Sequence, residues 1–156
     1  NYSLNKLGEN MSVIAKLKLI SSKKSRSLSP IVQRRNKLIA KIAEQTELAT
    51  AQKEGRLYAP KKLKTVTNVD TGERRTIETT KRVKEWYWTS DAGKINLSVR
   101  YGSKVIELAK GKNAIEVANS DELLSTLGII KEAVMAGELD DAINTASDKL
   151  RSGFAK

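Results

Sequence analysis

The residues best suited to bind a ligand are the aromatic run Trp86-Tyr87-Trp88, which stands out because only 4% of the chain is aromatic. If residues 82–89 form a β-strand, alternation places both tryptophans on the same face as Arg82 and Lys84. Proteins that bind single-stranded nucleic acids use this combination, with bases stacked on the rings and phosphates held by the cations. The alternative is that both tryptophans fill the core, as large aromatic side chains usually do. The sequence leaves both interpretations open.

Further candidate phosphate ligands lie on the strand expected at residues 94–101, where side chains alternate between an apolar and a polar face. The apolar face carries Ile95, Leu97, Val99 and Tyr101. The polar face carries Lys94, Asn96, Ser98 and Arg100. This polar face could follow a phosphate backbone without reading its sequence, or it could simply be solvated.

Two arginines, Arg74 and Arg75, lie beside Asp70-Thr71-Gly72, which is typical of a hairpin turn. Near the tip of a projecting hairpin they could enter a groove or clamp a backbone. The alternative is that one of them is an edge charge that prevents pairing with other strands.

The positive charge is concentrated in the first part of a chain whose net charge is +11. Residues 1–64 contain 15 Lys and Arg against 4 acids, whereas residues 119–156 contain 4 against 7. The candidate phosphate ligands of this part are Lys23, Lys24, Arg26, Arg34, Arg35, Lys37 and Lys41. The asymmetry predicts a polyanion-binding arm attached to a more neutral body, although such charges can also serve solubility alone.

The chain contains no Cys and no His. Disulfides, thiolate or imidazole metal sites, a Cys nucleophile and the most common general base are therefore excluded. The acidic pairs Asp121/Glu122 and Asp140/Asp141 stand at expected helix starts, where they complement the helix dipole. No phosphate-cradling glycine motif is present. We therefore expect a protein that is not an enzyme and that has no cofactor, no metal and no small-molecule substrate.

No apolar run approaches the ~18 residues that span a bilayer, and the N-terminal residues do not form a signal peptide. We expect a cytoplasmic protein that does not engage membranes. Met11 is compatible with a native start, which would make residues 1–10 an extension. A length of 156 residues is that of one domain, here with an attached arm.

The chain divides into three predicted parts. Residues 1–28 form a flexible basic segment, in which residues 11–20 could be a short helix or a strand and residues 21–29 are rich in Ser, Lys and Arg. Residues 29–64 form a basic helix and its connector, with Ser29-Pro30 at the start and Gly55 just after the end. Ile31, Leu38, Ile42 and Ala49 would form the inner face of this helix. Residues 65–156 form a domain of a sheet and helices.

The last part predicts five to six strands and then two helices. The strand segments are 64–69, 73–79, 82–89, 94–101, 104–108 and 114–117, joined by short turns that require antiparallel pairing. Asn119 or Ser120 caps the first helix, whose apolar stripe is Leu123, Leu124, Leu127, Ile130 and Val134. Gly137 ends it, and a second helix runs from Glu138 to about Leu150. The predicted class is α+β, an antiparallel meander with one face covered by the C-terminal amphipathic helices.

Residues 83–143 resemble the Whirly-type single-stranded nucleic-acid-binding proteins. The segment from Lys110-Gly111-Lys112 to Val117 is similar to the end of that family's sheet, and Asp121–Lys131 with Asp140–Ile143 is similar to its helix. The resemblance implies pairing of two copies through these helices and binding through the sheet face, by Trp86, Trp88, Lys94 and Arg100. Gly137 departs from the pattern because it interrupts the helix, and the basic N-terminal helix has no counterpart. The whole chain also resembles small uncharacterised proteins of bacteria and their phages, a likeness that implies no function.

These observations predict a protein that binds single-stranded DNA or RNA with low sequence specificity and that forms a homodimer. The alternative is a structural or protein-interaction module, including a phage-related one, that docks an acidic partner through its basic N-terminal region. An enzyme that uses Lys or carboxylates is a more distant alternative.

Overall fold

The computed structural model describes residues 13–24 and 27–154. Side chains 13–24 are all exposed, and a helical turn at Val13 and Ile14 is followed by a turn and then by chain without regular secondary structure, so no strand forms there. The expectations for residues 1–10, for Met11 and for Arg26 lie outside the described residues.

Helix α2 (Pro30–Lys53) forms where the sequence predicts it. Ser29 is extended and Pro30 occupies the first turn, but the Ser29 side chain makes no capping hydrogen bond. Gly55 adopts a φ of 72°, a left-handed conformation that ends the helix. Leu38, Ile42 and Ala49 are buried as predicted, and the structure adds Gln45, Leu48 and Ala51 to the buried side chains.

Strands β1 (Lys61–Thr67) and β2 (Arg74–Thr80) form an antiparallel two-stranded ribbon, in a register that pairs Lys61 with Thr80 and Thr67 with Arg74. The connecting loop contains the predicted turn, in which Gly72 has a φ of 72°. The Asn68 side chain accepts hydrogen bonds from the backbone N–H groups of Asp70 and Thr71 at 2.9 and 3.4 Å. This ribbon is hereafter called the hairpin.

The other strands are shorter than the sequence suggests, and they divide between two further sheets. One has the order β3-β4-β7, with β3 (Tyr87–Thr89), β4 (Ile95–Leu97) and β7 (Ile115–Val117). The other pairs β5 (Arg100–Tyr101) with β6 (Lys104–Val105). The expected strand at 94–101 is therefore interrupted at Ser98 and Val99. Its apolar face is inward as predicted, since Leu97, Val99 and Tyr101 are buried and Ile95 packs against the core.

Two helices complete the chain, α3 (Ser120–Met135) and α4 (Asp140–Phe154). The predicted cap is confirmed, because the Asn119 side chain accepts a hydrogen bond from the Glu122 N–H at 2.9 Å. The Glu122 carboxylate in turn accepts from the Ala118 N–H. Gly137, with a φ of 83°, separates the helices as predicted. The predicted stripe faces inward: Leu123, Leu127, Ile130 and Val134 are buried, and Leu124 is half-buried.

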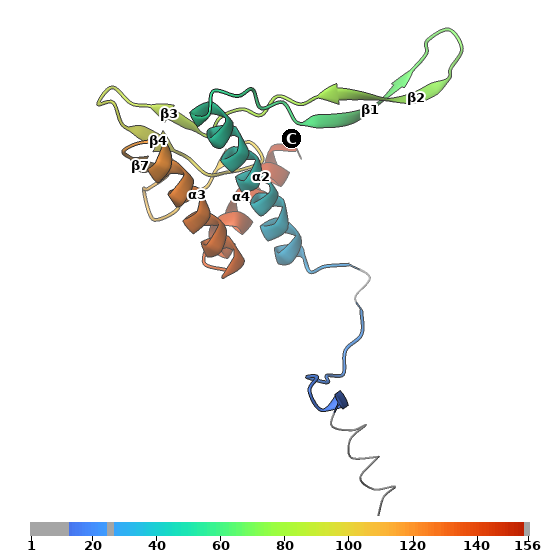
Figure 1. Cartoon of the computed structure of the whole chain (residues 1–156), viewed down its shortest axis with the longest axis horizontal. Helices are drawn as coiled ribbons and strands as arrows, with labels where there is room; N and C mark the ends of the chain where they lie inside the picture. Colours follow the sequence, from blue (N-terminus) through green and yellow to red (C-terminus); the bar gives the residue numbers. More distant parts are fainter. Residues whose placement is uncertain (1–12, 25–26, 155–156) are drawn as a thin grey trace, which may run out of the picture.

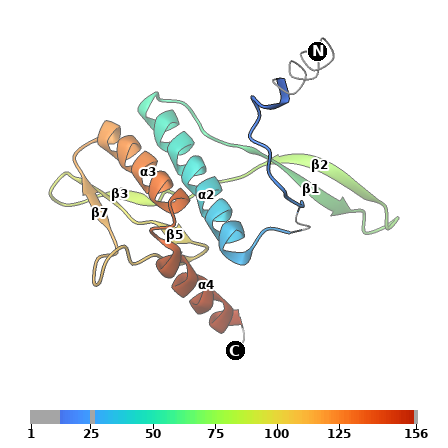
Figure 2. The ribbon, with the colours of Figure 1, turned by 90° about the horizontal axis from the view of Figure 1, so that it is seen from below.

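The class is α+β, as predicted. Helices α2 and α3 lie side by side and run in opposite directions (Figure 1 and Figure 2). α4 follows the end of α3 and contacts the first part of α2. α3 contacts β4 and β7, while α4 contacts β5 and β6. Side chains from α2, the short strands, α3 and α4 form one core cluster. The division expected between residues 64 and 65 falls inside β1, so it does not separate two cores.

The hairpin stands apart from this body. Both views show it extending away from the helices (Figure 1 and Figure 2). β1 and β2 contact mainly each other. None of the helices in the described part of the chain is long and apolar enough to cross a membrane.

Candidate nucleic-acid interface

A cationic pocket lies where the hairpin joins the body. It has a volume of about 190 Å³ and is formed by α2, the segment after β2 and the β5–β6 turn. Its lining contains five cations and one acid: Lys41, Lys81, Arg82, Lys84, Arg100 and Glu44. Four of these cations, together with the Trp86 that also lines the pocket, are predicted site residues, although they come from three separate parts of the sequence. We call this site the cationic pocket.

Glu44 neutralises only part of this charge. Its carboxylate accepts a hydrogen bond from Lys81 at 2.7 Å and lies 3.2 Å from the Lys41 ammonium. Partial burial raises the pKa of Glu44, but the hydrogen bonds from Lys81 and Lys41 outweigh it and hold the pKa below its ordinary value. The same hydrogen bond raises the pKa of Lys81. Lys81 is therefore charged at neutral pH, and Glu44 compensates part of the charge of the two lysines beside it.

The other three cations of the pocket have no acidic partner among the described residues. Arg82 and Lys84 are exposed, and Arg100 is half-buried and reaches the Ser103 carbonyl only at 3.4 Å. Cations held close together without counter-charges repel one another, and an anion bound between them would relieve that repulsion. The pocket can therefore hold an anionic group such as a phosphate.

Gln45 on α2 positions the segment from Lys84 to Trp86, which lines the pocket. Its side chain is only 3% exposed. Its amide N–H donates to the Lys84 carbonyl at 2.9 Å, and its amide oxygen accepts from the Trp86 N–H at 2.9 Å. The strip from Lys84 to Trp86 is thereby fixed against α2. The sequence interpretation missed Gln45, although a polar residue three positions after the buried Ile42 on an apolar helix face was the available signal.

Of the two interpretations that the sequence leaves open for the tryptophans, the stacking platform does not form, and core packing holds for Trp86 alone. Trp86 belongs to the core and is 9% exposed, whereas Trp88 is 48% exposed. The two do not share a face because β3 begins only at Tyr87, and residues 81–86 run along α2 instead of forming a strand. Trp88 pairs with Asn96, which pairs in turn with Glu116, so an acid rather than a cation shares its face.

Tyr87, at the start of β3, is half-buried and reaches α2. Its hydroxyl donates to the Gln52 side chain, and burial raises its pKa to about 12. This phenol therefore stays neutral at physiological pH and serves as a structural contact.

The predicted polar sheet face also does not form. Lys94 is exposed and Asn96 is half-buried, but Ser98 is 4% exposed and its hydroxyl donates to the Trp86 carbonyl at 3.3 Å. The strand is interrupted at that point, and Arg100 consequently lines the cationic pocket instead of continuing a face with Lys94.

Two cations of α2 hold the fold together. Arg34 donates to the Asn144 side chain at 2.8 Å, and Arg35 forms an ion pair with Asp140. The hydrogen bond from Arg35 lowers the pKa of Asp140, and the same bond raises the pKa of Arg35. Both arginines therefore join α2 to the start of α4, which accounts for basic residues at a helix N-terminus that the dipole disfavours.

The other predicted ligands of the first part remain accessible to differing degrees. The Lys37 ammonium lies 4.9 Å from the centre of the Tyr101 ring, a cation–π contact. Lys23 and Lys24 are exposed, and Arg26 lies outside the described residues.

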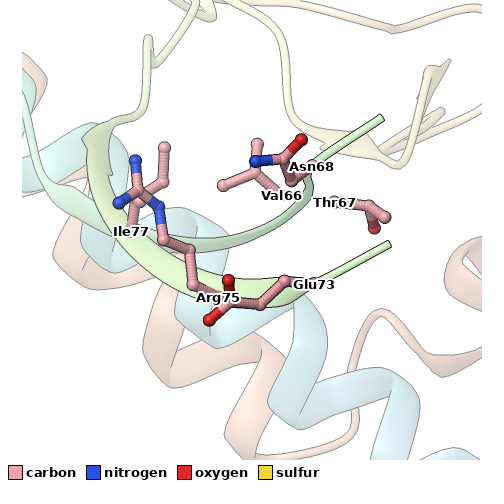
Figure 3. A pocket seen from close by; sticks show the side chains of 6 residues that line it. All are labelled: Val66, Thr67, Asn68, Glu73, Arg75 and Ile77. Atoms are coloured by element: carbon pink, nitrogen blue, oxygen red, sulfur yellow. The ribbon is translucent and has the colours of Figure 1, made fainter. Parts of the chain in front are cut away.

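The hairpin carries cations on both faces. The register places Arg75 opposite Val66 and Arg74 opposite Thr67, so the two arginines point to opposite sides. Lys62, Lys64 and Arg75 share one face with Val66, Ile77 and Thr79, and we call it the cationic face. On the other face, Lys61 forms an ion pair with Glu78 at 2.9 Å. A hollow of about 430 Å³ lies along the cationic face toward the tip, where Arg75, Val66 and Ile77 surround it (Figure 3).

The carboxylates of the C-terminal helices act in the fold. Asp121 pairs with Lys53, Glu122 caps α3 and Asp140 pairs with Arg35. Within the described residues, no group of acids is arranged to hold a metal ion. The predicted pairing of two copies through these helices stays a prediction, and the outer side of α3 leaves Ile129 and Met135 exposed.

Most of the chain matches one protein family. Residues 3–143 match the sequence model of DUF6641, a family of unknown function. The chain belongs to this family. The family region contains the hairpin and every residue of the cationic pocket, and it ends within α4. No curated protein and no solved structure matches the chain, and neither search connects it with the Whirly-type proteins.

Proposed function

We propose that this protein binds nucleic acid with low sequence specificity, and that the cationic pocket holds backbone phosphates. The observation that carries the proposal is the convergence of five cations and one acid on a single pocket. Phosphate contacts position a nucleic acid but do not read its sequence, so the binding should be largely independent of sequence.

A polymer fits this surface better than a small anion does. The pocket lies at the base of a hairpin that carries further cations, and the segment from Lys81 to Lys84 leads directly from β2 into it. A bound strand would therefore meet a succession of cations along its repeating phosphates. A single phosphate or carboxylate would occupy only the pocket.

The buried position of Trp86 changes the basis of the interaction. Stacking between two tryptophans is not available, and Trp88 shares its sheet face with Glu116, two strands away. Binding should therefore depend mainly on ion pairs with phosphates, and it should weaken steeply as salt increases.

The test compares two double variants in a salt series. A labelled oligonucleotide is titrated with the native chain, with Arg82→Gln/Lys84→Gln, and with Lys110→Gln/Lys112→Gln, which removes two exposed charges outside the pocket. Each lost phosphate contact removes about 0.7 from the log–log salt slope for single strands and about 0.9 for duplexes. We expect the pocket variant to lose about 1.4 or 1.8 of slope, and the control to change little.

Equal losses in the two variants would reduce the effect to net charge and contradict a site at the pocket. Failure of the native chain to bind any oligonucleotide at low salt would reject the proposed function. Docking of an acidic protein by the basic N-terminal region would then become the leading alternative.

A further inference from the structure

The hairpin is built as a free-standing ribbon. Each strand has seven residues and pairs only with the other, which leaves both outer edges unpaired in the described sheet. Only three of its side chains are even half-buried: Val66, Ile77 and Thr79. An isolated two-stranded hairpin is marginally stable in water, so a ribbon of this length is most easily explained by a partner that it contacts.

The side chains of the hairpin indicate what that partner is. Three cations lie on its cationic face, and neither strand contributes an acid to that face. Glu73, immediately before β2, lines the same hollow near the tip. Residues 61–80 contain no aromatic residue, and of their six threonines only Thr79 lies on the cationic face. Cations are suited to phosphates, whereas the absence of aromatic rings removes the stacking that holds single strands.

The dimensions of the ribbon agree with one kind of groove. Seven residues at ~3.4 Å each span roughly 20–24 Å, and paired strands lie about 4.8 Å apart. The major groove of B-form DNA is about 12 Å wide and 8.5 Å deep and admits a two-stranded ribbon. The major groove of an RNA duplex is too narrow for side chains to read.

We propose that the β1–β2 hairpin binds double-stranded DNA by lying in its major groove, with the cationic face directed at the DNA. In this arrangement Lys62, Lys64 and Arg75 bind phosphates at the groove edges, and Val66 and Ile77 approach the base edges, where thymine methyl groups are apolar partners. This inference rests on the proposed function and adds that the hairpin prefers duplex DNA. Glu73 opposes the interaction because its charge faces the same phosphates.

The hairpin provides a matched pair of variants. Lys64→Gln/Arg75→Gln removes one lysine and one arginine from the cationic face, whereas Lys61→Gln/Arg74→Gln removes the same residue types from the opposite face. All four side chains are exposed, so the fold should be retained, which circular dichroism checks. Both variants are titrated against duplex DNA, duplex RNA and single-stranded DNA of the same length.

The native chain should bind duplex DNA more tightly than either other ligand. At ~0.1 M salt each phosphate contact contributes a factor of about eight through counterion release, so Lys64→Gln/Arg75→Gln should weaken duplex DNA binding roughly 60-fold. The opposite-face variant should weaken it only a fewfold. Glu73→Gln should strengthen it, and bulky substituents at C5 of the pyrimidines, which fill the major groove, should abolish the hairpin's contribution.

Several outcomes would overturn the inference. Equal effects of the two hairpin variants, or equal losses for all three nucleic acids, would exclude a face directed into the DNA groove. If Arg82→Gln/Lys84→Gln weakens binding while Lys64→Gln/Arg75→Gln does not, the proposed function stands and the hairpin's role is refuted. If the native chain binds none of the nucleic acids, both proposals fail.

Discussion

Replacement of Gln45 by leucine tests how the cationic pocket is held together. Leucine is similar in size but can neither donate to the Lys84 carbonyl nor accept from the Trp86 N–H. The Trp86 N–H is buried, and leaving a buried donor without a partner costs about 1–3 kcal/mol. The Lys84 carbonyl belongs to an exposed residue and can partly turn to water, so it adds less. The expected total loss of unfolding free energy is about 2–3 kcal/mol.

The assay is urea unfolding of the native chain, Gln45→Leu and Gln52→Leu. Gln52 lies on the same helix and also makes two side-chain hydrogen bonds, but it is exposed, so its loss should cost under about 1 kcal/mol. In thermal unfolding, Gln45→Leu should lower Tm by roughly 4–12 °C. Gln45→Leu should also weaken oligonucleotide binding, because the strip that carries Lys84 is no longer fixed. Equal stability losses in the two variants, or a loss for Gln45→Leu below about 0.5 kcal/mol, would refute the positioning role of Gln45.

Two further predictions concern an ion pair and the tryptophans. Because the pKa of Asp140 is lowered in the folded chain, its pair with Arg35 stabilises the fold above the ordinary carboxyl pKa, and this contribution is lost as pH falls through the lowered value. Asp140→Asn should therefore be less stable than the native chain at neutral pH and should approach it in acid unfolding; a constant difference at all pH values would contradict the ion pair. Trp88→Phe should leave blue-shifted emission that iodide quenches poorly, since the remaining Trp86 is buried, whereas Trp86→Phe should leave accessible emission from Trp88. Equal quenching in both variants would contradict the assigned environments.

The helices and the hairpin turn could be predicted because their signals are local. Pro30 and Gly55 bound α2, Asn119 caps α3, and Gly137 separates α3 from α4. Each signal acts through backbone geometry or one hydrogen bond over a few residues, so no distant partner is needed to recognise it.

Alternation also predicted the inward side chains between Leu97 and Tyr101, because one apolar face must be buried whatever covers it. It failed for Trp86 and Trp88 because Trp86 lies before the strand and packs into the core, whereas Trp88 lies on the strand and is exposed. The strand begins at Tyr87, and that beginning depends on the contact of the preceding residues with Gln45 on α2.

The order of local patterns and the distribution of charges along the sequence determined a basic α+β protein with its positive charge toward the N-terminus. Only the tertiary structure decided which of those charges are available. Packing of α4 against α2 placed Asp140 beside Arg35, so that cation became part of the fold. Packing of α2 against the segment after β2 brought Lys41 to Arg82 and Arg100, which formed a pocket. The physical reason is that charge is a property of single residues and can be read from the sequence. Whether a cation pairs within the fold or stays available to a ligand depends on which side chains lie within a few ångströms of it. Those side chains come from residues distant in the chain, so only the folded structure brings them there.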